Sequence, residues 1–205
     1  MKYLLVLIFG WISFGLQAQH DKEHVDHLVS KFTKSLEARN IVNYVYMYEY
    51  CNGSIEMFRL SDGRTCASKG TYYKAYVFWN EDKETLVKKI DNCGLFYSLP
   101  IINKEILSFV SANLQQLQEK VKKYEVETPE NLPTKQSAIH PCFKMFQFNI
   151  DDKSFGQTYN LYKLTNDSKY KNLNFDYNNN LKIVELEKLL NMEIMLMKPK
   201  FRRQL

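Results

Sequence analysis

Residues 71–90 have the sequence TYYKAYVFW-NEDK-ETLVKKI, and they give the clearest indication of the fold. In residues 71–79 both alternating sets of side chains include aromatic or aliphatic residues, which is typical of a β-strand. The polar residues 80–83 favour a turn, and residues 84–90 follow as a second extended segment. We therefore expect two neighbouring antiparallel strands joined by a tight turn.

Upstream, tyrosines occupy every second position from Tyr44 to Tyr50, a period that predicts a strand with four tyrosines on one face. Asn52-Gly53 follows directly and is a strong hairpin signal, so residues 54–60 are expected to return antiparallel to this strand. Downstream, residues 142–150 and 157–164 predict a further hairpin, with its turn at residues 151–156.

Helical periodicity appears in three places. Apolar residues at helical spacing predict a first helix from about residue 21 to residue 40. Asn103 is a suitable N-cap for a long helix that runs to about Tyr124. A third helix is expected from Leu181 to about Asn191, whereas residues 192–197 fit either its last turns or a terminal strand.

Strands that neighbour one another through tight turns, together with separate helices, predict an α+β fold. We expect an antiparallel sheet of about six strands, with two or three helices packed against one face and disulfides as staples. Residues 19–205 suit a single domain, in which the proline-containing segment at about 125–141 forms a long surface loop.

The first 18 residues predict a secretory signal peptide, with a lysine at the start, an apolar stretch and small residues before Ala18. The apolar stretch is shorter than the roughly 20 residues that a bilayer span requires, so we expect no transmembrane anchor. The sequence thus predicts an exported protein, either periplasmic or secreted.

The four cysteines all follow this segment, and an even number in an exported chain favours two disulfides. If residues 71–79 and 84–90 form a hairpin, Cys66 and Cys93 both lie at its open end. We therefore expect Cys66–Cys93 and Cys51–Cys142, in preference to the other two pairings. A disulfide at Cys142 would leave no thiolate beside His140 to act as a nucleophile.

His20, His24 and His27 lie at spacings that place them on one face of the first helix. Imidazoles one helical turn apart can chelate zinc or copper, so metal handling is one hypothesis for the function. A solvated polar face is the alternative interpretation of the same cluster, because the histidines lie near the start of the mature chain.

Tyr44, Tyr46, Tyr48 and Tyr50 are the candidate ligand-binding residues, because flat rings with hydroxyl tips suit sugars, peptides and protein interfaces. A sheet face covered by a helix would use the same residues in its core. No catalytic, nucleotide-binding or cofactor motif stands out, although a hydrolase built on two carboxylates stays an alternative. The formal charge of +5 is too small to indicate a nucleic-acid partner.

The sequence therefore favours a non-catalytic binding domain in the cell envelope or outside the cell. Its expected partner is a protein, a peptide or a glycan.

Overall fold

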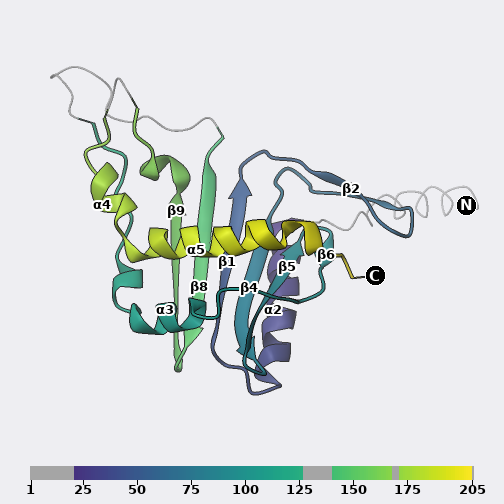
Figure 1. Cartoon of the computed structure of the whole chain (residues 1–205). Coiled ribbons are helices and arrows are strands. Elements are labelled where there is room, and N and C mark those ends of the chain that lie inside the picture. The colour runs from purple at the N-terminus through teal and green to yellow at the C-terminus, as the bar shows by residue number, and fades with distance from the viewer. Residues whose placement is uncertain (1–20, 127–139, 168–170, 205) are drawn as a thin grey trace, which may run out of the picture.

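The computed structural model describes residues 21–126, 140–167 and 171–204. Within these ranges the strands of a single antiparallel sheet have the order β6-β5-β4-β1-β8-β9, and β7 also pairs with β5 (Figure 1). A smaller sheet consists of β2 and β3. The strands are β1 Tyr44–Cys51, β2 Met57–Arg59, β3 Thr65–Ala67, β4 Lys74–Glu81, β5 Glu84–Asp91, β6 Gly94–Leu95, β7 Leu99–Pro100, β8 Cys142–Ile150 and β9 Lys153–Asn160.

Helices cover both faces of the sheet, rather than the one face expected from the sequence (Figure 1). The α-helices are α2 Lys22–Glu37, α3 Ile106–Ala112, α4 Phe175–Asn179 and α5 Lys182–Met197, and three short 3-10 helices are η1 Gln116–Gln118, η2 Leu161–Leu164 and η3 Lys198–Lys200. Helix α2 packs on β4, β5 and β6, whereas α5 crosses the opposite face with α3 beside it.

Each face has its own apolar core. On the α2 side, Val25 and Val29 pack with Trp79 and Ile90. On the α5 side, Phe146 and Phe148 pack with helical residues such as Leu186. Both alternating sets of β4 are buried, which explains why residues 71–79 carry apolar side chains at successive positions.

The α+β fold and the antiparallel sheet are confirmed, with two differences in the strands. Residues 54–60 do not return along β1, because both edges of β1 are already paired, with β4 and with β8. Instead, β2 pairs with β3 to form a separate hairpin. In the second predicted hairpin, the turn is only Asp151-Asp152, both with positive φ, so that β9 begins earlier than expected.

The long helix expected from Asn103 to Tyr124 is also shorter in the structure. Helix α3 ends at Ala112 and is followed by η1. The side-chain amide of Asn113 donates to the carbonyl oxygen of Phe109 at 2.8 Å. It thereby occupies the acceptor that the backbone N–H of Asn113 would use if the α-helix continued. Leu117 still reaches the core, where it is fully buried. At the other end of the chain, residues 192–197 continue α5 as helix.

The structure pairs Cys51 with Cys142 and Cys66 with Cys93, as predicted. Cys51 lies directly opposite Cys142 in the register of β1 and β8, and Cys66–Cys93 ties the β2–β3 hairpin to the end of β5. Residues 1–20 and most of the predicted loop at 125–141 lie outside the described residues. In the part of the chain that is described, no helix combines the length and apolar character of a membrane span.

Candidate functional site

The structure divides the four tyrosines of β1 into two pairs. Tyr44 and Tyr48 are buried beneath α2, where their hydroxyls donate to Glu37 at 2.9 Å and to Asp26 at 2.8 Å. These two side chains therefore contribute to the core on the α2 side. Burial, followed by the hydrogen bond to Glu37, raises the pKa of Tyr44 to about 12.

Tyr46 and Tyr50 are only half-buried. The ring of Tyr50 stacks on Phe143, with centroids 5.2 Å apart, and also meets Tyr73. Tyr46 lines a groove of about 340 Å³ between α2 and the half of the sheet formed by β8 and β9. Asp26 of α2 and Gln147 of β8 line the same groove, and Tyr44 and Tyr48 form part of its wall.

The predicted histidine cluster is only partly described. His24 and His27 lie in the first turns of α2, whereas His20 lies outside the described residues. Within the described ranges, no group of three or more His, Cys, Asp and Glu side chains is placed to hold a metal ion. The metal hypothesis, which requires His20, stays a prediction. The Cys142 sulfur is bonded to Cys51 and so is not a free thiol beside His140.

A second set of polar residues, which the sequence did not single out, lies on the α5 face. Lys144 of β8, Glu49 of β1, Lys74 of β4 and Asp91 of β5 are direct cross-strand neighbours in successive strand pairs. They form a row of alternating charge across four strands. We call these four residues the charged row. Opposite charges placed directly across a sheet attract one another, so the register itself pairs them.

The charged row is held by short contacts. Glu49 accepts from Lys74 at 2.6 Å and from Lys144 at 3.0 Å. Lys144, whose side chain is only 4% exposed, also lies 3.4 Å from Glu187 of α5. Burial alone would raise the pKa of Glu49, but the two lysines outweigh it, and the pKa is lowered. Glu49 is therefore ionised and is not poised to donate a proton.

At the other end of the row, Asp91 is fully buried and its carboxylate is saturated. Arg203 donates to both of its oxygens, at 2.6 and 3.0 Å, and the hydroxyl of Tyr72 donates at 2.7 Å. The backbone N–H of Cys93 adds a further hydrogen bond at 2.8 Å. Such a bidentate guanidinium contact fixes geometry as well as charge. The C-terminal segment is thereby attached to the sheet.

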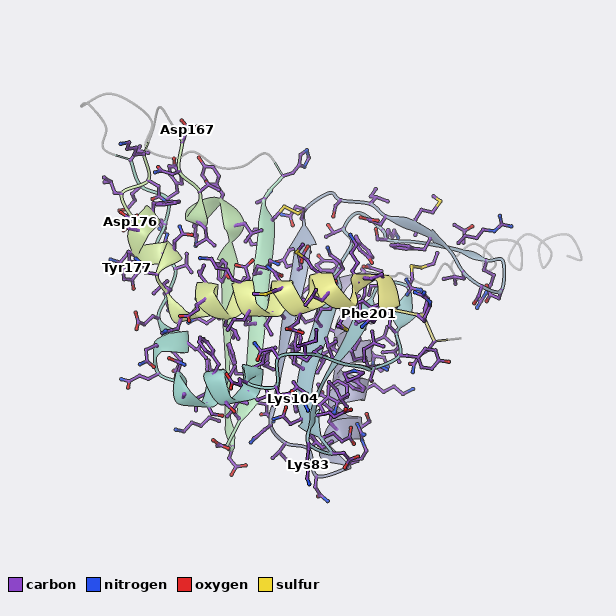
Figure 2. All side chains as sticks on the ribbon, viewed as in Figure 1. Lys83, Lys104, Asp167, Asp176, Tyr177 and Phe201 are labelled. Carbon is purple, nitrogen blue, oxygen red and sulfur yellow. A yellow bond between two sulfur atoms is a disulfide. The ribbon has the colours of Figure 1, made fainter. Side chains whose placement is uncertain are left out.

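Three members of the charged row, Lys144, Glu49 and Lys74, line a cleft of about 680 Å³ between the sheet and the C-terminal half of α5. We call this space the charged cleft. The β2–β3 hairpin supplies Phe58, and Phe201 lies just beyond the C-terminal end of α5 (Figure 2). The residues that line it are Glu49, Glu56, Phe58, Tyr72, Lys74, Tyr76, Lys89, Phe96, Lys144, Leu161, Glu187, Asn191, Ile194, Met195, Lys198 and Phe201. Its volume falls within the range typical of small-molecule sites.

Two polar groups that line the charged cleft have hydrogen-bonding capacity that the described residues leave unused. Tyr76 is 5% exposed, and its hydroxyl makes no hydrogen bond among the described residues. Lys89 lies directly opposite Tyr76 on β5, and its ammonium is 3.7 Å from the nearest carboxylate oxygen, that of Asp91. This separation exceeds hydrogen-bonding distance. Burial lowers the pKa of Lys89, with Asp91 acting in the opposite direction.

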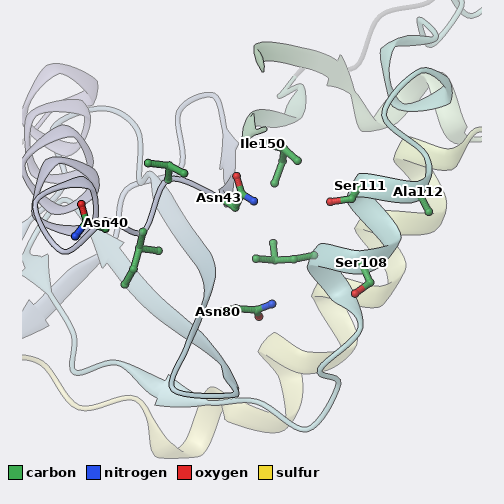
Figure 3. A pocket seen from close by; sticks show the side chains of 10 residues that line it. Asn40, Asn43, Asn80, Ser108, Ser111, Ala112 and Ile150 are labelled. Carbon is green, nitrogen blue, oxygen red and sulfur yellow. The ribbon is translucent and has the colours of Figure 1, made fainter. Parts of the chain in front are cut away.

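A second cavity of about 630 Å³ lies at the opposite end of the strands, between α3 and the residues that precede β1 (Figure 3). All of its lining residues are uncharged. Two of its asparagines have partners, since Asn43 donates to Asp151 and Asn80 accepts from Thr85, whereas Asn40, Ser108 and Ser111 are exposed. The charged cleft differs from this cavity in that charged side chains line it.

The sequence does contain a signal for the charged cleft. Glu49 and Lys144 continue the alternating sets that include Met47 and Phe146, which are fully buried in the core. A charge in phase with core residues indicates a buried polar site, because an isolated buried charge is costly.

No protein-family model, curated protein or solved structure matches the chain.

Proposed function

We propose that this protein is an exported, non-catalytic binding domain, and that its ligand occupies the charged cleft. The observation that carries the proposal is the Tyr76 hydroxyl, which makes no hydrogen bond among the described residues, beside the Lys89 ammonium, whose ion pair with Asp91 is long at 3.7 Å, in a cleft of about 680 Å³. Burying polar groups without hydrogen bonds is costly, and a ligand that supplies the missing partners recovers that cost.

Export to the periplasm or beyond the cell is supported by the two disulfides, which persist mainly in oxidising compartments. The predicted signal peptide points in the same direction. Both features suit a ligand that is met outside the cytoplasm.

The lowered pKa of Glu49 favours binding over catalysis. Glu49 and Glu187 converge on Lys144, as two catalytic carboxylates would converge on a substrate. However, an acid catalyst needs a carboxyl group with a raised pKa, and that of Glu49 is lowered. Two lysines, Lys74 and Lys144, hold the Glu49 carboxylate in ion pairs.

A thermal-shift screen of a small-molecule library tests the proposal with two matched variants of α5. Met195, 73% exposed, lines the charged cleft, whereas Met192, 56% exposed, does not. Hits should stabilise the wild-type protein and the Met192→Trp variant but not the Met195→Trp variant, whose new ring fills the entrance. Hits that stabilise all three proteins equally, or an absence of hits, would refute this site.

The groove beside Tyr46 supports a second candidate function, the docking of a protein, peptide or glycan. Tyr46 and Tyr50 keep part of their rings exposed, and the neighbouring β9 residues Ser154, Gly156 and Thr158 are also exposed. Tyrosine in such a setting combines an apolar ring with a hydrogen-bonding tip.

A further inference from the structure

We propose that the ligand of the charged cleft is a small carboxylate with an aromatic or branched apolar body, and that its carboxylate is held between Lys89 and Tyr76. This inference rests on the proposed function and names the chemical class of the ligand.

Lys89 supplies the positive charge. Its ammonium lies 3.7 Å from its nearest counterion, Asp91, and that carboxylate already accepts from Arg203, Tyr72 and Cys93. The ring of Phe96 lies beside the ammonium, with its centroid 4.5 Å away, and the positive charges of Arg203 and Lys74 also act on it. The ammonium thus has unused donors in a half-buried setting, where an anionic acceptor is worth more than in water.

Tyr76 supplies the second donor. Burial, followed by the negative charges of Glu49 and Asp91, raises the pKa of Tyr76, so its hydroxyl keeps its proton at neutral pH. A protonated hydroxyl can donate to one carboxylate oxygen while the ammonium of Lys89 donates to the other. Because Tyr76 and Lys89 are direct cross-strand neighbours, both donors reach the same small region of the cleft.

The charge of the cleft matches a monoanion. Four lysines and three glutamates line it in the described part of the chain, so one positive charge is in excess. Asp91 and Arg203 behind them neutralise each other. A carboxylate brings one negative charge, whereas a phosphate dianion would leave a charge without a partner, at a high cost in a half-buried site.

The aromatic side chains that line the charged cleft indicate what the apolar body of the ligand is like. Phe96 meets Phe201 edge-on, with centroids 6.1 Å apart, and Tyr76 lies 6.0 Å from Phe201. Phe58 and Tyr72 form a second pair of rings, 5.3 Å apart, on the hairpin side. A flat or branched apolar body can pack against these rings while its carboxylate reaches the sheet.

Isothermal titration calorimetry on the disulfide-bonded protein tests the ligand class with three probes of similar shape: phenylacetate, phenylacetamide and phenethylamine. Phenylacetate should bind at least about tenfold more tightly than the neutral amide, and the cationic amine should not bind measurably.

Two variants test the contacts, and a third is the control. Lys89→Met and Tyr76→Phe should each weaken phenylacetate binding, Lys89→Met by at least about tenfold and Tyr76→Phe by about fivefold. Lys88→Met should leave it unchanged, because Lys88 precedes Lys89 on the same strand but contacts Phe32 of α2 on the other face. Circular dichroism melts identify any variant that has failed to fold.

The outcomes separate the ligand class from the proposed function. If amide and carboxylate bind equally, and both are lost in Met195→Trp, the cleft is a binding site but the carboxylate assignment is wrong. If phenylacetate still binds Met195→Trp, both proposals fail. If none of the probes binds the wild-type protein, or if Lys88→Met weakens binding as much as Lys89→Met, the carboxylate assignment is overturned.

Discussion

Tyr76 and Lys89 face each other across β4 and β5; the Tyr76 hydroxyl makes no hydrogen bond among the described residues, and the Lys89 ammonium has only a long contact of 3.7 Å with Asp91. Their neighbours Tyr72 and Asp91 show the opposite behaviour, with the Tyr72 hydroxyl 2.7 Å from a fully buried carboxylate. The Tyr72–Asp91 pair therefore stabilises the fold, whereas Tyr76 and Lys89 line the charged cleft and keep hydrogen-bonding capacity for a ligand.

This contrast predicts opposite effects of the same chemical change. Tyr72→Phe removes a hydrogen bond to a buried carboxylate and should lower the free energy of unfolding by about 1.5–3 kcal/mol. Tyr76→Phe removes a buried hydroxyl that has no partner among the described residues, and should leave the free energy of unfolding unchanged or raise it. Urea unfolding of the two variants measures both values. Equal losses would mean that the Tyr76 hydroxyl contributes to stability.

Local patterns in the sequence were sufficient for much of the fold. The alternation in residues 44–51 and 142–150 predicted strands with the bounds that the structure has. Tertiary pairing was not predictable in the same way. Asn52-Gly53 favours a local hairpin, but β1 pairs with β4 and with β8, whose residues are distant in sequence, and only the completed sheet determines that choice.

The same limit applies to the candidate site. Glu49 and Lys144 are visible in the sequence as charges in phase with buried residues, but their contact depends on the register of β1 with β8. The tyrosine period correctly placed four rings on one face. It could not show that α2 covers Tyr44 and Tyr48 and leaves Tyr46 half-exposed, because that depends on where the helix packs.

Lys144 should be essential for stability, because it bridges Glu49 and Glu187. Lys144→Met leaves the buried Glu187 without a cation, while Glu49 keeps Lys74, and we expect a loss of about 3 kcal/mol in the free energy of unfolding. Lys182→Met is the matched control, since it breaks the exposed pair with Glu185 and should cost less than about 0.5 kcal/mol. Denaturant unfolding gives both numbers, and similar values for the two variants would contradict the importance of the buried network.

The raised pKa of Tyr44 predicts a loss of stability at alkaline pH. Its pKa is raised to about 12 in the folded protein, by burial first and by Glu37 second, whereas an unfolded tyrosine titrates near pH 10. The folded state therefore holds the proton more tightly, and this contribution to stability is complete below about pH 10 and is lost as the pH rises to about 12. Comparing the unfolding free energy of the wild-type protein with that of Tyr44→Phe across this range isolates the effect. The difference should shrink with rising pH, and a constant difference would contradict it.

Alanine variants of Tyr46 and Tyr48, two residues apart on β1, should distinguish a role in binding from a role in folding. Tyr48 is 2% exposed and donates to Asp26, so Tyr48→Ala should cost about 3–5 kcal/mol of unfolding free energy as a truncated core aromatic. Tyr46 is half-exposed beside the groove, and Tyr46→Ala should cost less than about 1.5 kcal/mol. If the groove docks a partner, Tyr46→Ala should also weaken that binding by about 2 kcal/mol, which is typical of an interface hot spot. Thermal and urea melts of the single variants decide the first point without a known partner. A Tyr46→Ala protein as unstable as Tyr48→Ala would assign all four tyrosines to packing and remove this groove as a docking site.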